Sequence, residues 1–307
     1  MKKVAVILLL IISSAAYAQQ DPLFTHYMYN KLAFNPGYAG SRDLFSMEMI
    51  GRFQWVGIQG APRTISFTAH SPLQNPHIGL GLNAYRDELG PTVDYGATAS
   101  FAYRVLFPTS KLCFGVAAGF KYMDIDWGML NPKDPNDPSL TNQVKNKVVP
   151  DVDFGIYYYS DRFYVGLSSR HLLQNQIVVS SASDGSTSFT KLMRHFYGMA
   201  GVVIPISDNV VFTPSVLCKY VVNTPFQTDV NASFMFHDVL VLGISYRTDN
   251  AIGLLAEVNI TRNFSIGYSY DIWFNALKAY NSGSHEIRLG YDFDIFNKSR
   301  MLTPRYF

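Results

Sequence analysis

The chain has 307 residues, of which 16% are charged and 15% are aromatic, and it contains 25 lysine and arginine residues against 23 aspartate and glutamate residues. Typical soluble domains carry about 25% charged residues, so this composition argues against an ordinary soluble protein. Without Lys2 and Lys3 the basic count becomes 25 − 2 = 23, equal to the 23 acidic residues. A balanced chain of this kind lacks the basic surface of a nucleic-acid-binding protein.

Residues 1–18 have the features of an export signal. Lys2 and Lys3 precede the apolar run Val4–Ile12, and Ala16-Tyr17-Ala18 places small residues at the two positions that a signal peptidase reads. The apolar run is well short of the roughly 20 residues of a membrane-spanning helix. We therefore predict cleavage after Ala18 and export of the remaining chain.

The next stretch, Asp21–Gly40, is too aromatic for a linker and too irregular for a strand. Asp21 followed by Pro22 suits a helix N-cap with proline at the first helical position. Between Phe24 and Lys31, apolar side chains recur at three- and four-residue spacing, which predicts a short helix. Asn35-Pro36 is expected to end this helix, because a residue before proline avoids the helical conformation.

From residue 43 onward, apolar and polar residues alternate, which is the pattern of a sheet with two different faces. In residues 284–296, for example, Ile287 and Leu289 lie on one face and Glu286 and Arg288 on the other. A soluble β-sandwich would also alternate. We expect about fourteen strands, near residues 43–53, 63–71, 77–86, 92–106, 111–124, 151–159, 162–172, 194–206, 210–222, 227–237, 239–248, 251–260, 263–273 and 284–296.

The connections between these strands alternate in length. The even-to-odd links are short, and the longest gaps, 125–150, 173–193 and 274–283, are all odd-to-even links. Outer-membrane barrels have short periplasmic turns and longer outer loops, whereas a sandwich gives no reason for this alternation. The sequence therefore predicts an all-β fold, a closed transmembrane antiparallel β-barrel with a short N-terminal plug segment.

Twelve charged residues share the inward, polar side of the expected strands. They are Glu48, Arg104, Lys121, Asp153, Arg170, Lys219, Asp229, Arg247, Glu257, Asp271, Glu286 and Arg288. Buried charges must be paired, so we expect ion pairs across the lumen; a water-filled channel with solvated wall charges is the alternative. Small inward residues such as Gly79 and Gly115 leave room for an occupant, either Asp21–Gly40 or the loop Phe53–Pro62 folded inward.

Motifs that carry chemistry are absent from the sequence. It has no GxSxG, Walker, HExxH or CxxC pattern, and we predict a non-enzymatic protein without cofactor or metal. A hydrolase assembled from different strands is the minor alternative. Cys113 and Cys218 fall in strands that should not be neighbours, so we expect free thiols on or near the lipid face.

Two blocks of the sequence have a distinctive spelling: QDP-x-F-x-x-Y-M-x-N with NP-x-YAG, in residues 20–40, and R-x-QW-x-G-x-x-GAP-x-T, in residues 52–64. These blocks resemble motifs of the PorP/SprF family, whose members are outer-membrane proteins of the type IX secretion system, a system that also serves gliding motility. Later blocks follow in the family's order at Pro150-Asp151, Tyr246-Arg247, Tyr268–Asp271, Gly283–Ile287 and Pro304–Phe307. His26 departs from the small or amide residue expected at that position.

The resemblance implies two sets of functional positions. Residues of the first block would set a plug or brace: Asp21, Pro22, Phe24, Tyr27, Asn30, Asn35, Pro36, Tyr38 and Gly40. Residues of the second block would shape a partner-docking outer loop: Gln54, Trp55, Gly57, Gly60, Ala61 and Pro62. An aromatic belt residue at the membrane edge is the alternative for Trp55.

The implied protein is an outer-membrane barrel that supports type IX secretion or surface anchoring of a partner such as an adhesin. Its expected partners are the C-terminal domain of the secreted substrate, periplasmic type IX components and outer-membrane lipid. A diffusion channel or hydrophobic-solute transporter is the alternative. The expected divisions are a signal peptide (1–18), an N-terminal periplasmic or plug segment (19–42), the barrel (43–296) and a periplasmic tail (297–307).

Overall fold

The computed structural model describes residues 21–129, 147–181, 187–248 and 250–295. The predicted signal peptide and the predicted C-terminal tail therefore lie outside the described residues. The strands are β1 (Phe45–Phe53), β2 (Arg63–Pro72), β3 (Ile78–Leu89), β4 (Thr92–Leu106), β5 (Ser110–Ile125), β6 (Lys147–Ser160), β7 (Phe163–Arg170), β8 (Gln176–Ser181), β9 (Thr187–Lys191), β10 (His195–Val202), β11 (Ile204–Ser207), β12 (Val210–Val221), β13 (Gln227–Phe236), β14 (Leu240–Arg247), β15 (Ala251–Asn259), β16 (Phe264–Trp273) and β17 (Ser284–Phe293).

Short 3₁₀ helices are the only helices in the described parts of the chain: η1 (Lys31–Ala33), η2 (Pro36–Tyr38), η3 (Trp127–Met129) and η5 (Ala276–Tyr280). None of the helices found there is long and apolar enough to cross a bilayer.

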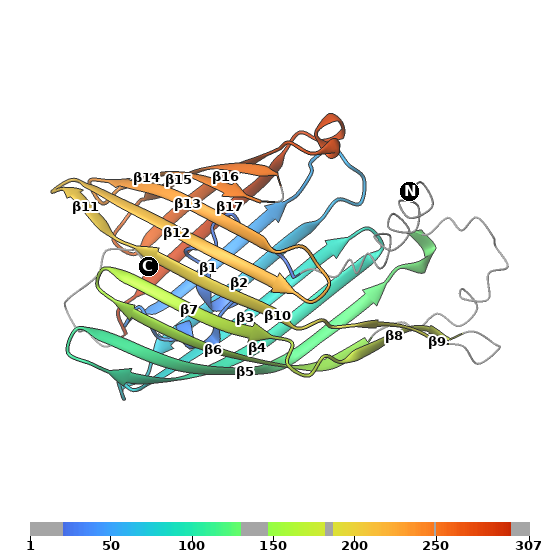
Figure 1. Ribbon diagram of the computed structural model, residues 1–307, viewed down its shortest axis with the longest axis horizontal. Coiled ribbons are helices and arrows are strands. Elements are labelled where there is room, and N and C mark those ends of the chain that lie inside the picture. The colour runs from blue at the N-terminus through green and yellow to red at the C-terminus, as the bar shows by residue number, and fades with distance from the viewer. Residues whose placement is uncertain (1–20, 130–146, 182–186, 249, 296–307) are drawn as a thin grey trace, which may run out of the picture.

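The strands of the wall form a closed ring. Each wall strand pairs antiparallel with its neighbours in sequence, β1 also pairs with β17, and β10 pairs with both β7 and β12. The strands β10 and β11 form one wall strand interrupted at Val203, so the described wall has fourteen strands. The predicted all-β antiparallel barrel is confirmed (Figure 1). Among the described strands, the pairing of β10 with β12 closes the sheet into a ring, which matters because an unpaired backbone group in lipid is costly.

The two ends of the barrel differ. At one end, tight connections such as 161–162 and 208–209 join neighbouring strands, and we call this the short-turn end. At the other, which we call the long-loop end, the connection between β7 and β10 carries the β8–β9 hairpin, which projects beyond the wall (Figure 1). This hairpin was not predicted from the sequence.

The two faces of the wall follow the alternation of the sequence. On β17, Ile287 and Leu289 are exposed on the outer face, whereas Glu286 and Arg288 are fully buried on the inner face. Cys218 is half-buried on the outer side and carries a free thiol. The expectation of a lipid-facing Cys113 is wrong, because this free cysteine is fully buried on the same inner face as Gly115 and Ala117.

The outer face of the wall should contact lipid, so a charge placed there should destabilise the barrel. Leu289 is 39% exposed near the middle of β17, so Leu289→Arg should lower the free energy of unfolding in lipid by about 2–4 kcal/mol. Urea unfolding of the barrel in liposomes measures the change, with Leu289→Val as the matched apolar control. Equal stability of these two variants would contradict a lipid-facing position.

Candidate functional site in the barrel lumen

The lumen is occupied by residues 21–43, which we call the lumen segment. Residues 24–41 are all buried, and their apolar side chains form the largest hydrophobic cluster together with inward wall residues such as Tyr157 and Tyr197. The core of this barrel therefore consists of a chain segment packed inside the wall (Figure 1).

The lumen segment crosses the barrel from one end to the other. At the long-loop end, Asp21 Oδ2 lies 2.8 Å from Arg170 Nη1, at the end of β7. At the short-turn end, the Asp43 carboxylate pairs with Arg104 and Lys111. The chain then turns into β1.

The segment is not the short helix that the spacing predicts. Residues 25–29 form turns, followed by η1 and η2. The Asp21 carboxylate binds wall residues instead of capping a helix. Asn35 does cap η2, because its side-chain oxygen accepts a hydrogen bond from Gly37 N at 2.8 Å, while its amide nitrogen lies 3.0 Å from Ile156 O in β6. Contacts with the wall thus override the helical spacing.

Two wall glycines let the backbone of the segment approach closely. A Cβ atom on Gly115 would lie 2.2 Å from Gly37 N, and one on Gly79 would lie 2.1 Å from Ala39 O. Any larger residue at these positions would push the segment away from β3 and β5. Gly290 is also crowded, since a Cβ atom there would lie 2.4 Å from Arg288 Nη2.

A buried ionic cluster ties the first turn of the segment to the wall. Glu286 accepts hydrogen bonds from Thr25 N (2.9 Å) and His26 N (2.8 Å), and it contacts His26 Nδ1 at 2.7 Å. Arg52 lies 2.9 Å from Glu286 and 2.6 Å from Asp271. Glu286 thereby satisfies two backbone amides that would otherwise be buried without acceptors.

A second cluster lies nearby on the same side of the lumen. Arg288 pairs with Glu48 at 2.7 Å and with Glu257 at 2.8 Å. Its guanidinium group also lies 4.2 Å from the centre of the Tyr29 ring, which is the geometry of a cation–π interaction.

The structure places all twelve of the inward charges named from the sequence in buried positions. Beyond the two clusters above, Arg170 pairs with Asp153, Arg247 with Asp229, and Lys121 with Asp94. Lys219 Nζ lies 3.4 Å from the backbone oxygen of Asp21. Arg52 and Asp94 also form ion pairs inside the wall, but they were not among the twelve charges named from the sequence, although alternation within the strands identifies them.

The residues named for a plug or brace all lie in the lumen segment, and all except half-buried Pro22 are buried. Tyr27 Oη lies 3.0 Å from Ser215 Oγ, and Asn30 Oδ1 accepts a hydrogen bond from Thr68 Oγ1 at 2.9 Å. The Tyr38 ring packs edge-on against Tyr157, and Gly40 N donates to His70 Nδ1 at 3.2 Å. Phe24 packs edge-on against Phe34.

Asp21 lies in a group of buried residues at the long-loop end. His171 Nε2 lies 2.9 Å from Asp21 Oδ1, and His171 Nδ1 lies 2.7 Å from Asp151 Oδ2. Burial alone would lower the pKa of His171, but the carboxylates of Asp21 and Asp151 outweigh burial and raise this pKa to about 9. This group was not predicted from the sequence, because its members lie far apart along the chain.

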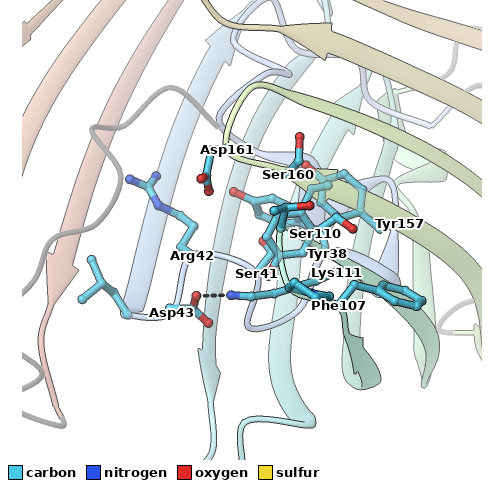
Figure 2. A pocket seen from close by; sticks show the side chains of 14 residues that line it. Tyr38, Ser41, Arg42, Asp43, Phe107, Ser110, Lys111, Tyr157, Ser160 and Asp161 are labelled. Atoms are coloured by element: carbon cyan, nitrogen blue, oxygen red, sulfur yellow. Dashed lines mark hydrogen bonds and ion pairs between the residues drawn. The ribbon is translucent and has the colours of Figure 1, made fainter.

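A cavity of about 190 Å³ lies at the short-turn end, between the lumen segment and two turns of the wall (Figure 2). Tyr38, Arg42 and Asp43 line it from the segment, and Lys111 and Tyr159 line it from the wall. Burial alone would raise the pKa of the Asp43 carboxyl, but the charges of Arg104 and Lys111 outweigh burial and lower it. Asp43 is therefore ionised at neutral pH and holds the end of the segment in place.

The loop between β1 and β2 lies at the long-loop end and does not enter the lumen. Trp55 is half-buried, and its ring packs edge-on against Trp273 at 5.6 Å. Val56 exchanges backbone hydrogen bonds with Ser282 and Gly283 of the β16–β17 loop. Of the other docking-loop residues, Gly57 and Gly60 are exposed and Gln54, Ala61 and Pro62 are half-buried.

A family model described as "Type IX secretion system membrane protein PorP/SprF" matches residues 16–291. The chain belongs to the PorP/SprF family. As a family member with this fold, it is an outer-membrane β-barrel of type IX secretion. No curated protein matches this PorP/SprF chain.

Solved outer-membrane barrels share the fold of the PorP/SprF barrel at low sequence identity. The monoaromatic hydrocarbon channel CymD is 10% identical with a TM-score of 0.51, and the match covers 87% of this chain and 93% of CymD. The Pseudomonas putida toluene transporter TodX is 8% identical with a TM-score of 0.50, and the match covers 91% of this chain and 95% of TodX. At this identity the likeness shows the fold alone.

Proposed function

We propose that this PorP/SprF protein is a closed, non-enzymatic docking barrel, which holds a secreted type IX substrate at its long-loop end. The main support for the proposal is that the lumen segment fills the barrel, with residues 24–41 all buried. A lumen filled in this way suits a protein that binds a partner with its loops better than one that passes solutes.

The docking surface in this proposal consists of the β1–β2 loop and the neighbouring β16–β17 loop. Trp55 supports this surface by packing against Trp273. Val56 and Tyr280, on the two loops, are 39% and 74% exposed. Exposed apolar and aromatic side chains on adjoining loops are typical of interaction sites. Trp55 thus shapes the surface, and its neighbours make the contact.

Site-specific photocrosslinking in intact cells tests the docking proposal. A photoreactive residue at Val56 or Tyr280 should crosslink to a secreted protein that carries a type IX C-terminal domain. The matched control position is Ile244, which is 50% exposed on the outer face of β14 and should contact lipid. Equal crosslinking at all three positions, or none at the loops, would contradict the proposal.

The rival function is a diffusion channel or transporter for hydrophobic solutes. Two observations favour this rival function. One is the cavity beside Tyr38 and Tyr159 at the short-turn end, and the other is the fold shared with channels whose names refer to such solutes. A steady conductance or solute flux through the intact wild-type barrel would favour this rival over the docking role.

A further inference from the structure

Three potential metal ligands meet at the long-loop end of the lumen. One carboxylate oxygen of Asp21 and one ring nitrogen each from His171 and His195 lie within 4.8 Å of one another, and all three residues are buried. Asp21 belongs to the lumen segment, His171 follows β7, and His195 begins β10. The cluster therefore joins the start of the segment to two places in the wall.

Both imidazole rings are oriented as metal-binding histidines are. His195 Nδ1 lies 2.8 Å from Met193 O, so Nδ1 carries the proton. Nε2 is then the acceptor, and it receives a long hydrogen bond of 3.5 Å from Asp21 N. His171 Nδ1 lies 2.7 Å from an Asp151 oxygen, and its Nε2 faces Asp21. Histidine ligands commonly bond a carbonyl or carboxylate through the other ring nitrogen, which fixes the ring and strengthens the ligand.

The charges around the cluster leave room for a cation. With His171 neutral, the carboxylates of Asp21, Asp151 and Asp153 face the cations Arg170 and Lys219, which leaves an excess of one negative charge. Arg170 Nη1 donates a hydrogen bond to Asp21 Oδ2, and the other carboxylate oxygen of Asp21, Oδ1, is directed at His171 Nε2. Without a metal ion, His171 Nε2 and Asp21 Oδ1 lie at hydrogen-bond distance, 2.9 Å apart.

We propose that Asp21, His171 and His195 bind one divalent transition-metal ion, with Zn²⁺ as the best fit. Two imidazole nitrogens and one carboxylate oxygen form a common zinc ligand set, with water in the fourth position. Bonds of about 2.0–2.1 Å in a tetrahedron place neighbouring donors about 3.3 Å apart, close to the 2.9 Å between His171 Nε2 and Asp21 Oδ1.

Such an ion would fasten the start of the lumen segment to the wall. The inference does not depend on the docking role, because it concerns how the segment is held and not what the loops bind. Metal binding without substrate crosslinking would leave this inference intact, and the reverse result would leave the docking proposal intact.

The test uses the full-length protein, purified in detergent, stripped with EDTA and titrated with Zn²⁺ by calorimetry. We expect one ion per chain, and at least about 10-fold weaker binding in His195→Gln. The matched control is His285→Gln, since His285 lies at the same end of the wall, at the start of β17, outside the cluster. Its binding should equal that of the wild type.

Two further measurements keep the test decisive if the His195→Gln variant does not fold. Heat-modifiable migration on gels shows whether each variant is folded. Co²⁺ added to the wild type should give the intense visible absorption of a tetrahedral site, and Zn²⁺ should remove it. Absence of stoichiometric binding by the wild type, or equal Zn²⁺ affinity of the wild type and folded His195→Gln, would overturn the proposal.

Discussion

Replacing Glu286 with alanine should lower the free energy of unfolding by about 3–5 kcal/mol, the usual cost of removing one partner from a buried ion pair. The Glu286 side chain is fully buried and accepts hydrogen bonds from two backbone amides of the lumen segment. Its removal leaves those amides without their acceptor and leaves Arg52 with Asp271 as its remaining ion-pair partner. Urea unfolding in liposomes, followed by tryptophan fluorescence, measures the loss.

Glu88→Ala is the matched control for this prediction. Glu88 also lies near a strand end, but its ion pair with Arg86 is partly exposed to solvent, and such pairs contribute about 0–1 kcal/mol. Glu286→Gln should fall between the two alanine variants, because the amide oxygen still accepts one hydrogen bond. A loss for Glu286→Ala no greater than that for Glu88→Ala would show that the cluster does not stabilise the barrel.

Deleting residues 21–40 should convert a non-conducting barrel into a pore. The deletion removes the side chains that fill the lumen and leaves a wall lined by Glu48, Arg288 and the other inward charges. Water would then solvate those charges, as in the channel of an open barrel. Single-channel recordings in planar bilayers should show steady current for the deletion variant and none for the wild type.

The control for the pore prediction is deletion of Ala276–Asn281, which shortens the β16–β17 loop outside the lumen and should leave the barrel non-conducting. Both variants are first tested for heat-modifiable migration, so that only folded barrels are compared. If the folded 21–40 deletion carries no current, another part of the chain closes the lumen, and the lumen segment is a brace rather than a plug.

The wall could be predicted from the sequence because its signal is local. Along each strand, apolar residues that face lipid alternate with polar residues that face the lumen, as Leu289 and Arg288 do. The fourteen predicted strands all have counterparts in the wall. The β8–β9 hairpin was not predicted because it lies outside the wall, in a connection predicted to be a loop. No membrane or lumen imposes a two-faced pattern on it.

The interior was harder to predict because its contacts link distant parts of the chain. The spacing of Phe24 and Tyr27 favoured a helix, yet wall groups such as Ile156 O and Gly115 determine the path of the segment. Asp21 lies 150 residues from His171 and 174 from His195 in sequence. A single sequence holds no pattern that brings such residues together.

The crossing of the lumen by residues 21–43 constrains how the protein can be assembled. Asp21 and Asp43 are anchored at opposite ends of a ring that closes where β1 meets β17. A segment in that position must be threaded lengthwise through a finished cylinder or be enclosed as the cylinder seals. Enclosure avoids moving the charges of Asp21 and Lys31 lengthwise through the lumen, so we expect the wall to close around this segment during assembly.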